Sequence, residues 1–284
     1  MNLSMKTKWI DLKGELSAAW AISIKMWRVD LSYPISVLYF IVTPLLTLVP
    51  MIIYGFAIVG GQYSNNLAQL TGQADWIIYT ILGSAFLSLM TASFWGTAWT
   101  LRREAWEGTI ESLYVTPISR FTMIFGSTLH ETSHAGLGIA LQLILVYFLF
   151  GYSINPTNIL LGLTIVALGM LSIQAIGIFL SSLVLQFKQG WIIGESLEAV
   201  FLVITPAAYP IAILPTIFQW MSYISPITYG TEAFRMAMMW GYSNQLLWIL
   251  GVLIIIDFVG TILAMLIFKR VEQRSRKRGA VGKF

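Results

Sequence analysis

The chain has 284 residues, of which 57% are hydrophobic and only 11% are charged. Soluble proteins carry about 25% charged residues, so this composition excludes an ordinary soluble domain and indicates a membrane protein. The net charge of +4 fits contact with anionic lipid and gives no reason to expect a nucleic-acid partner.

Residues 1–32 are expected to form a cytoplasmic N-terminal region that carries an amphipathic helix. Apolar residues recur there at spacings of three, four or seven, with charged residues between them: Trp9, Leu12, Leu16, Trp20 and Trp27. This pattern predicts a helix lying in the membrane interface, with its tryptophans at headgroup depth. Such a helix is either an anchor, or a gate or a shelf that helps to seat a cytoplasmic partner.

Residues 33–268 are expected to form one transmembrane domain. Six apolar stretches are long enough to cross the roughly 30 Å of hydrocarbon in a bilayer, and the polar breaks between them favour helices over a β-barrel. They are Tyr33–Val59, Trp76–Leu101, Phe121–Phe150, Asn158–Gln186, Trp191–Tyr209 and Leu246–Phe268. The expected fold is therefore an all-α membrane protein with six transmembrane helices.

Proline marks two irregular regions. Pro34, Pro44 and Pro50 predict a bend or an interruption in the first span. The segment Pro206–Asn244 holds four of the nine prolines, and its apolar run Ile213–Trp220 is too short to span. This segment predicts two short external helices that re-enter the membrane surface before the last span.

The basic residues predict the orientation. Sixteen of the seventeen fall on one side of the predicted spans, with Arg235 alone on the other. By the positive-inside rule both termini are cytoplasmic, and residues 269–284 form a basic cytoplasmic tail. We therefore expect a multi-pass protein of the cytoplasmic (inner) membrane.

A short charged segment lies between the second and third spans and predicts a separate amphipathic helix. At about 100° per residue, Glu104, Glu107 and Glu111 share one stripe. The opposite stripe is apolar, and the segment closes on Pro117. Its acidic face is expected to touch a charged partner outside this chain. The alternative is a solvated loop whose acids pair with the neighbouring Arg102 and Arg103.

Two segments resemble the landmarks of one family. The sequence EAWEGTIESLYVTPISR (residues 104–120) resembles the cytoplasmic loop of ABC-2 type permeases, and SPITYGTEAFR (residues 225–235) is similar to the external landmark before their last span. Those proteins are the membrane subunits of bacterial and archaeal ABC exporters. Both motifs stand in the expected places, so the resemblance covers essentially the whole chain.

The resemblance implies a permease that exports an amphiphile with energy from a separate ATPase. The partners implied are two copies of the ATPase subunit, a second copy of the permease in a homodimer, membrane lipids and the substrate. The loop would be a coupling helix that docks on the ATPase through Glu104, Trp106, Glu107, Gly108, Thr109, Ile110, Glu111, Leu113 and Pro117. The sequence has no phosphate-binding GxxxxGK[ST] loop, so no catalytic residue and no cofactor are expected here; ATP and Mg²⁺ would belong to the partner.

A second motif favours different chemistry. His130-Glu131-Thr132-Ser133-His134 matches His-Glu-x-x-His, whose histidines share one helical face and bind Zn²⁺ in metalloproteases. These are the only two histidines, so a third ligand must be a carboxylate, and Asp257 is the sole candidate in mid-span. An intramembrane zinc metalloprotease is therefore the alternative function. The favoured interpretation has no metal.

Ionisable residues within the spans are costly and often line a polar pathway. The candidates for a substrate path or gate are Glu131, His134, Asp257, Glu195 and Glu198. The alternative for each is a hydrogen bond between helices. The cargo expected from the resemblance is a hydrophobic drug, a lipid, a lipid-linked glycan or a peptide, among which the sequence does not choose.

Overall fold

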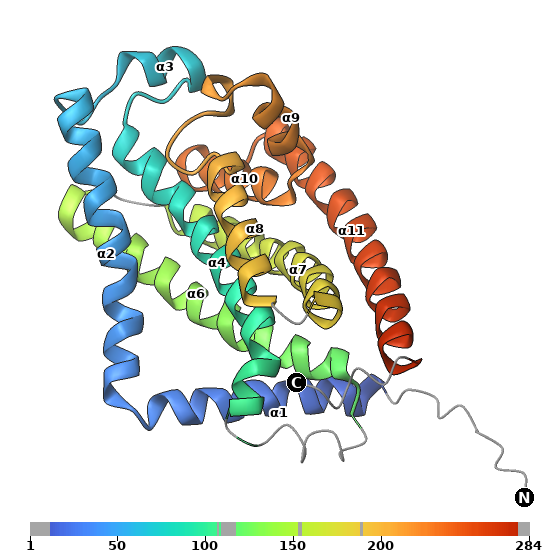
Figure 1. Cartoon of the computed structure of the whole chain (residues 1–284). Coiled ribbons are helices and arrows are strands. Elements are labelled where there is room, and N and C mark those ends of the chain that lie inside the picture. Colours follow the sequence, from blue (N-terminus) through green and yellow to red (C-terminus); the bar gives the residue numbers. More distant parts are fainter. Residues whose placement is uncertain (1–11, 107, 109–117, 153–154, 188–189, 278–284) are drawn as a thin grey trace, which may run out of the picture.

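The computed structural model describes the chain except for residues 1–11, 107, 109–117, 153–154, 188–189 and 278–284. In the described part every element is a helix, apart from one isolated antiparallel bridge between Tyr63 and Asp75 (Figure 1). The prediction of an all-α fold is therefore confirmed.

Long helices run obliquely from one end of the molecule to the other (Figure 1). They are α2 (Pro34–Val59), α4 (Trp76–Trp106), α6 (Arg120–Phe150), α7 (Pro156–Phe187) and α11 (Asn244–Lys277). Four of the described helices contain a stretch that is long and apolar enough to cross a membrane: Trp76–Gly96, Phe121–Phe150, Pro156–Leu183 and Asn244–Val271. The chain is thus a multi-pass membrane protein.

The helix α2 matches the first predicted span, with one correction. Its backbone stays helical through Pro44 and Pro50, so the alternative of an interruption there is wrong. The helix begins with Pro34 in its first turn, where a missing N–H costs nothing, and ends at Gly60 with a left-handed φ of 74°.

The fifth predicted span is shorter than expected. Its helix, α8, covers Gly190–Ile204 and stops five residues before Tyr209. Fifteen residues rise about 22 Å, less than the roughly 30 Å of hydrocarbon. Pro206 follows closely and cannot donate to a continuing helix, so the chain leaves the helix at Thr205.

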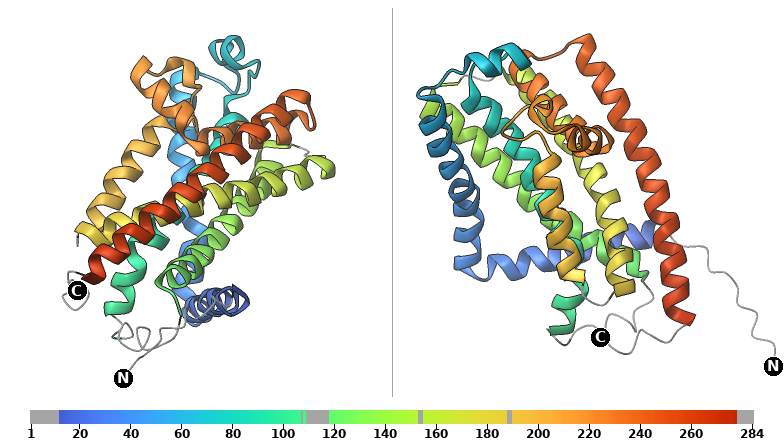
Figure 2. Two further views of the ribbon diagram at one scale, coloured as in Figure 1. Left: turned by 90° about the vertical axis from the view of Figure 1, so that its right-hand side faces the viewer. Right: turned by 45° about the horizontal axis from the view of Figure 1, so that its top comes forward.

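The N-terminal helix α1 (Leu12–Leu31) lies across the base of the bundle, and the views of Figure 2 show it set at a steep angle to α2. It approaches α6 closely at Gly126. A Cβ on Gly126 would lie 2.7 Å from the carbonyl oxygen of Ala19 and 3.0 Å from the side chain of Ile22. The absence of a side chain at Gly126 therefore allows the two helices to pack together.

Short helices cover the opposite end: α3 (Asn65–Thr71), η1 (Ile211–Ile213), α9 (Thr216–Ile224) and α10 (Pro226–Trp240). The prediction of two short helices before the last span is confirmed by α9 and α10. Their burial differs, however. Most of α10 is buried against α4, α7 and α11, whereas α9 exposes large side chains such as Ile217 and Trp220.

Among the residues whose burial is described, the core contains a fully buried cation, Arg235 of α10, which is 1% exposed. Its guanidinium donates to the backbone oxygen of Tyr79 at 3.0 Å, to the backbone oxygen of Ala207 and to the carboxylate of Glu232 at 3.1 Å. The guanidinium carbon lies 3.6 Å from the centroid of the Tyr79 ring. A buried charge is tolerated when it is paired in this way.

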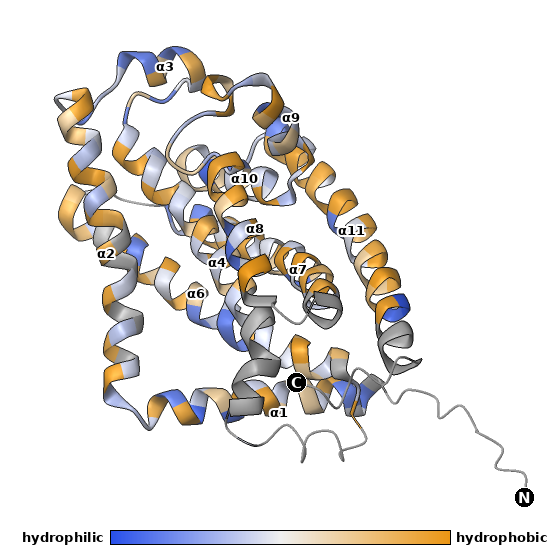
Figure 3. Cartoon of the chain, viewed as in Figure 1, coloured by the Kyte–Doolittle hydropathy of each residue, from blue (hydrophilic) through white to orange (hydrophobic). Residues whose placement is uncertain are grey.

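The hydropathy of the helices follows their arrangement in the bundle. Figure 3 shows apolar residues along most of α2, α7 and α11, and more hydrophilic ones on α1 and α3. The end that carries α1 also holds the end of α11, with Lys269 and Arg270 exposed. The first and last described segments therefore lie at the same end of the bundle.

Replacing Gly83 tests the packing around Arg235. A Cβ at Gly83 would collide with the guanidinium of Arg235 and the carbonyl oxygen of Ala207. We expect Gly83→Ala to destabilise the fold by about 1–3 kcal/mol, the usual cost of overpacking. Thermal unfolding of the purified protein in detergent measures this.

The matched control is Gly251→Ala in α11, because a Cβ there meets no atom within 4 Å. This change should be neutral or stabilise slightly, since alanine favours a helix over glycine. Equal destabilisation by both changes would contradict the proposed clash.

Candidate functional site

The predicted coupling segment begins at the end of α4. Glu104 and Trp106 belong to the last helical turn, although their side chains lie outside the described residues. Glu107, Thr109, Ile110, Glu111, Leu113 and Pro117 lie wholly outside them.

Gly108 lies between these undescribed residues and has a φ of 69°. That is the left-handed conformation, which ends a helix and cannot sit inside one. A single helix therefore does not pass from Glu104 to Glu111, and the predicted stripe joining them is wrong at this point. The helix is interrupted because Gly108 has no Cβ, so the left-handed conformation costs little free energy at the position where α4 ends.

The other end of the segment is held by α1. Ser119 is the N-cap of α6, and its hydroxyl accepts from the backbone N–H of Thr122 at 3.1 Å. The carboxylate of Glu15 accepts from the Ser119 hydroxyl at 3.0 Å, from the Ser119 N–H at 3.3 Å and from the Thr122 hydroxyl. An anion at a helix N-terminus is favourable.

The environment of Glu15 changes its pKa. Partial burial acts to raise the pKa of this carboxyl, but the hydrogen bonds from Thr122 and Ser119 outweigh burial and leave the pKa below its ordinary value of 4.5. The ionised form therefore binds the start of α6 at neutral pH.

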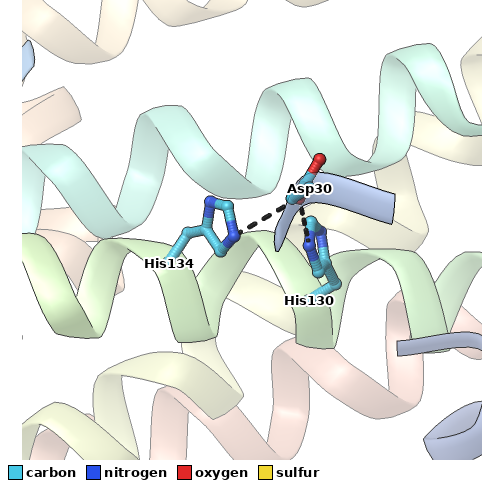
Figure 4. A group of neighbouring side chains, drawn as sticks. All are labelled: Asp30, His130 and His134. Carbon is cyan, nitrogen blue, oxygen red and sulfur yellow. Dashed lines mark ion pairs between the residues drawn. The ribbon is translucent and has the colours of Figure 1, made fainter. Parts of the chain in front are cut away.

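The two histidines of the His-Glu-x-x-His motif meet Asp30 at the end of α1 (Figure 4). Nε2 of His130 lies 2.8 Å from Oδ2 of Asp30, and Nε2 of His134 lies 3.5 Å from the same oxygen. The histidine side chains are 2% and 7% exposed and that of Asp30 is 22% exposed. The carboxylate that meets both histidines is thus Asp30, whereas the sequence offered Asp257 as the sole mid-span candidate for a third ligand.

Trp27 covers this cluster. Its ring centroid lies 4.2 Å from that of His134 and 5.4 Å from that of His130, and its Nε1 donates to the Ser133 hydroxyl at 2.9 Å. The headgroup depth expected for Trp27 stays a prediction, but its side chain packs against α6. Trp27 lies three residues before Asp30, on the face of α1 that is turned toward α6.

Glu131 lies beside the cluster. Its Oε1 is 3.8 Å from Nδ1 of His130, on the opposite side of the ring from the nitrogen that faces Asp30. A Cβ on Gly96 would lie 2.8 Å from Cγ of Glu131, so the Glu131 side chain packs closely on α4.

Asp257 lines a cavity of about 830 Å³ between α4, α7, α8 and α11. The lining is otherwise almost entirely apolar and includes Phe94, Phe179 and Phe201, with Ser172 beside the carboxylate. Asp257 is 7% exposed, and neither of its carboxylate oxygens has a hydrogen-bond partner among the described residues. A carboxylate in such a cavity can bind the polar or cationic group of an amphiphile.

The remaining candidates do not join this cavity. Glu195 is exposed on α8 and Glu198 is half-buried, and neither lines the space around Asp257. The structure therefore separates the predicted path residues into an α6 group, an α8 pair and Asp257.

Comparison with known proteins decides the family. The family model described as ABC-2 type transporter matches residues 20–239, which is more than half of the chain. The chain belongs to the ABC-2 type transporter family. A search of curated proteins finds no match.

Membership accounts for the architecture. ABC-2 proteins are the membrane domains of transporters, so this chain is a transport permease and its long apolar helices are its membrane domain. Permeases of this family have no ATP site of their own and generally pair with an ABC ATPase subunit.

Sequence reasoning missed Asp30 and Glu15 as partners of α6. Both lie on α1 about 104 residues before the groups they contact, and no local spacing reveals such a pairing. One signal was present: Glu15 and Asp30 are the acids of a helix that is otherwise basic.

The Glu15 contact makes the stability depend on pH. A carboxyl whose pKa is lowered on folding stabilises the protein above its unfolded pKa, and that contribution is lost as the pH falls through the folded value. Glu15→Gln should therefore cost about 1 kcal/mol at pH 7, given the partial exposure of the pair. The difference from wild type should shrink as the pH falls below 4.5.

Thermal unfolding of both proteins at several pH values measures this. Ser17→Ala, an exposed change on the same helix, should follow wild type throughout. A gap between wild type and Glu15→Gln that stays constant down to pH 3 would refute the charged contact.

Proposed function

We propose that this permease is the membrane subunit of an ATP-driven exporter, and that it moves an amphiphilic or hydrophobic substrate out of the cytoplasm. The energy comes from ATP hydrolysed on a separate ATPase subunit. The observation that carries the proposal is the family match over residues 20–239, in a chain whose sequence lacks a phosphate-binding loop.

The flanking helices support a role in coupling for residues 107–117. In the sequence these residues join α4 to α6, and α6 begins at the end of the bundle where α1 lies (Figure 1). Sixteen of the seventeen basic residues fall on this side of the predicted spans, which favours a cytoplasmic position for both termini in the inner membrane. Glu107 and Glu111 there would meet basic groups of the ATPase, with Ile110 and Leu113 giving an apolar contact.

The assembly follows from the family resemblance. Two permeases form a homodimer, each with one ATPase subunit, and the substrate passes between them. In each permease, α2 and α8 add to the four long apolar helices to give six spans. Because α8 is short, the chain goes on from it through the re-entrant segment to α10. Closure of the ATPase pair moves the loop and the helices attached to it as rigid bodies.

The cavity around Asp257 supports an amphiphilic cargo. Its volume of about 830 Å³ lies within the range of sites that bind drug-sized molecules, roughly 300–1,000 Å³. An apolar body would fill the aromatic lining, and a cationic or hydrogen-bond-donating group would meet the carboxylate.

Zinc proteolysis is not favoured. A metalloprotease needs its glutamate beside the metal-bound water, on the side of the histidines that faces the metal. Here Glu131 lies at the far nitrogen of His130, 3.8 Å away, while Asp30 occupies the other side. This arrangement does not place Glu131 as a general base.

Charge reversal in the loop tests the coupling. We expect Glu107→Lys/Glu111→Lys to abolish co-purification with the ATPase, or to leave ATP hydrolysis that substrate no longer stimulates. Like charges at the contact would now repel basic groups of the partner. The measurement is co-purification of the two subunits, followed by ATPase activity in reconstituted vesicles.

Glu272→Lys is the matched control, because it reverses one charge on the predicted cytoplasmic part of α11 outside the loop. This variant should still co-purify with the ATPase and show ATP hydrolysis that the substrate stimulates. Unchanged coupling in the loop variant would overturn the coupling role of Glu107 and Glu111. The absence of any ATPase partner for wild type would overturn the proposed function.

Replacing Asp257 tests the cavity. Asp257→Asn should weaken the binding of a cationic substrate roughly tenfold, because a hydrogen-bonded charge pair is worth about 1.5–3 kcal/mol. Transport of a panel of cationic and neutral fluorescent amphiphiles into inverted vesicles measures this. Neutral members of the panel should be much less affected.

Glu195→Gln on α8 serves as the comparison, since Glu195 is exposed outside the cavity. If Glu195→Gln impairs the cationic substrates and Asp257→Asn does not, the path follows α8 and the cavity is not the binding site.

A further inference from the structure

The cluster at the junction of α1 and α6 has the composition of a metal site. One side-chain atom each from Asp30, His130 and His134 lies within 4.8 Å of the others. Two imidazoles and one carboxylate are ligands that suit divalent transition metals such as Zn²⁺, whereas Mg²⁺ and Ca²⁺ prefer oxygen.

We propose that Asp30, His130 and His134 bind one divalent transition-metal ion, with Zn²⁺ as the best fit, and that this ion fastens the end of α1 to the middle of α6. The sequence favoured no metal, because the two histidines needed a carboxylate as a third ligand and Asp257 was the sole candidate in mid-span. The fold supplies that ligand from α1.

The distances between the donor atoms agree with such a site. Ligands at about 2.0–2.1 Å from a tetrahedral zinc ion lie roughly 3.3–3.4 Å from each other. Oδ2 of Asp30 is 2.8 Å from Nε2 of His130 and 3.5 Å from Nε2 of His134. These two separations straddle the ideal, and the third pair of donors lies within 4.8 Å, so rotations of the side chains would bring all three donors onto one ion.

The hydrogen bonding of His130 also favours an ion. Its side chain is 2% exposed, and neither ring nitrogen has a hydrogen-bond partner in the described part of the chain. The Asp30 oxygen is close to Nε2 but lies outside the direction of a ring N–H. A buried polar atom without a partner is costly, and a metal ion between the two groups would remove that cost.

The surroundings complete the site. Glu131 lies 3.8 Å from Nδ1 of His130, beyond hydrogen-bond distance, and a small rotation would bring it to the position from which a carboxylate commonly orients a metal-binding imidazole. Trp27 covers both imidazole rings and shields the site from water. Asp30 is the most exposed ligand, at 22%, and marks the route by which the ion enters.

The test measures metal bound to the purified permease alone, so its outcome does not depend on the ATPase or on transport. The protein carries a purification tag free of histidine, is stripped with a chelator and is titrated with Zn²⁺. We expect one Zn²⁺ per chain and a higher unfolding temperature with Zn²⁺ but not with Mg²⁺. Co²⁺ in its place should give the visible absorption of a four-coordinate ion.

Three variants define the ligands. His134→Gln and Asp30→Asn should weaken Zn²⁺ binding at least about 100-fold, since even the loss of an outer partner costs 10–100-fold. Asp30→His replaces one ligand with another and should retain binding. Glu15→Gln removes a carboxylate elsewhere on α1 and should still bind one ion.

The unfolding temperature without metal shows whether each variant is folded. If His134→Gln unfolds early even without metal, Asp30→Asn and its rescue by Asp30→His decide the outcome. Wild type without stoichiometric Zn²⁺ overturns the proposal. Zinc binding of wild-type strength in both His134→Gln and Asp30→Asn overturns it as well.

Discussion

A backbone carbonyl that ends a helix in apolar surroundings has no water to bind, and the end of this permease opposite α1 is built around that constraint. The helix α8 stops after 15 residues, which leaves its last carbonyls without partners in the helix. The Tyr209 hydroxyl donates to the oxygen of Val203 at 2.5 Å, and the Ser222 hydroxyl donates to that of Ile204 at 2.5 Å. The guanidinium of Arg235 donates to the backbone oxygen of Ala207. These three side chains therefore pair backbone oxygens at the end of α8 and in the irregular chain after it.

The pairing of Arg235 dictates the packing around it. Its guanidinium reaches Ala207, in the irregular chain after α8, because α10 is buried against α4, and α4 leaves room for it because Gly83 has no side chain. Next to this region, the ring of Phe86 fits between α7 and α10 because Gly169 and Gly230 have no side chains. A Cβ on either glycine would collide with the ring. These contacts hold α4, α7 and α10 together at the end of the bundle opposite α1. The opposite end of α4 leads directly to residues 107–117.

The sequence predicted the long helices well because hydrophobic length is a local property. The bounds of α2, α4, α6 and α7 differ from the predicted spans by a few residues at most, except that α4 runs on to Trp106. The end of α8 was missed because the apolar run continues past Ile204, although Pro206 had been noted. Asp30 was missed for another reason. Its contact with His130 joins residues 100 positions apart, and the helical period says nothing about which helices meet.

The contacts between α1 and α6 keep one register over much of α1. Glu15 meets Ser119 at its start, Ile22 faces Gly126 further along, and Trp27 bonds Ser133 near its end. The offset is 104 residues in each of the first two pairs and 106 in the third, so α1 follows the first half of α6 in parallel. A helix held at successive turns moves with its neighbour. Because α6 begins at Arg120, shortly after residues 107–117, a displacement of the start of α6 would carry α1 with it. This packing is compatible with both alternatives predicted for α1, an anchor and a gate or shelf.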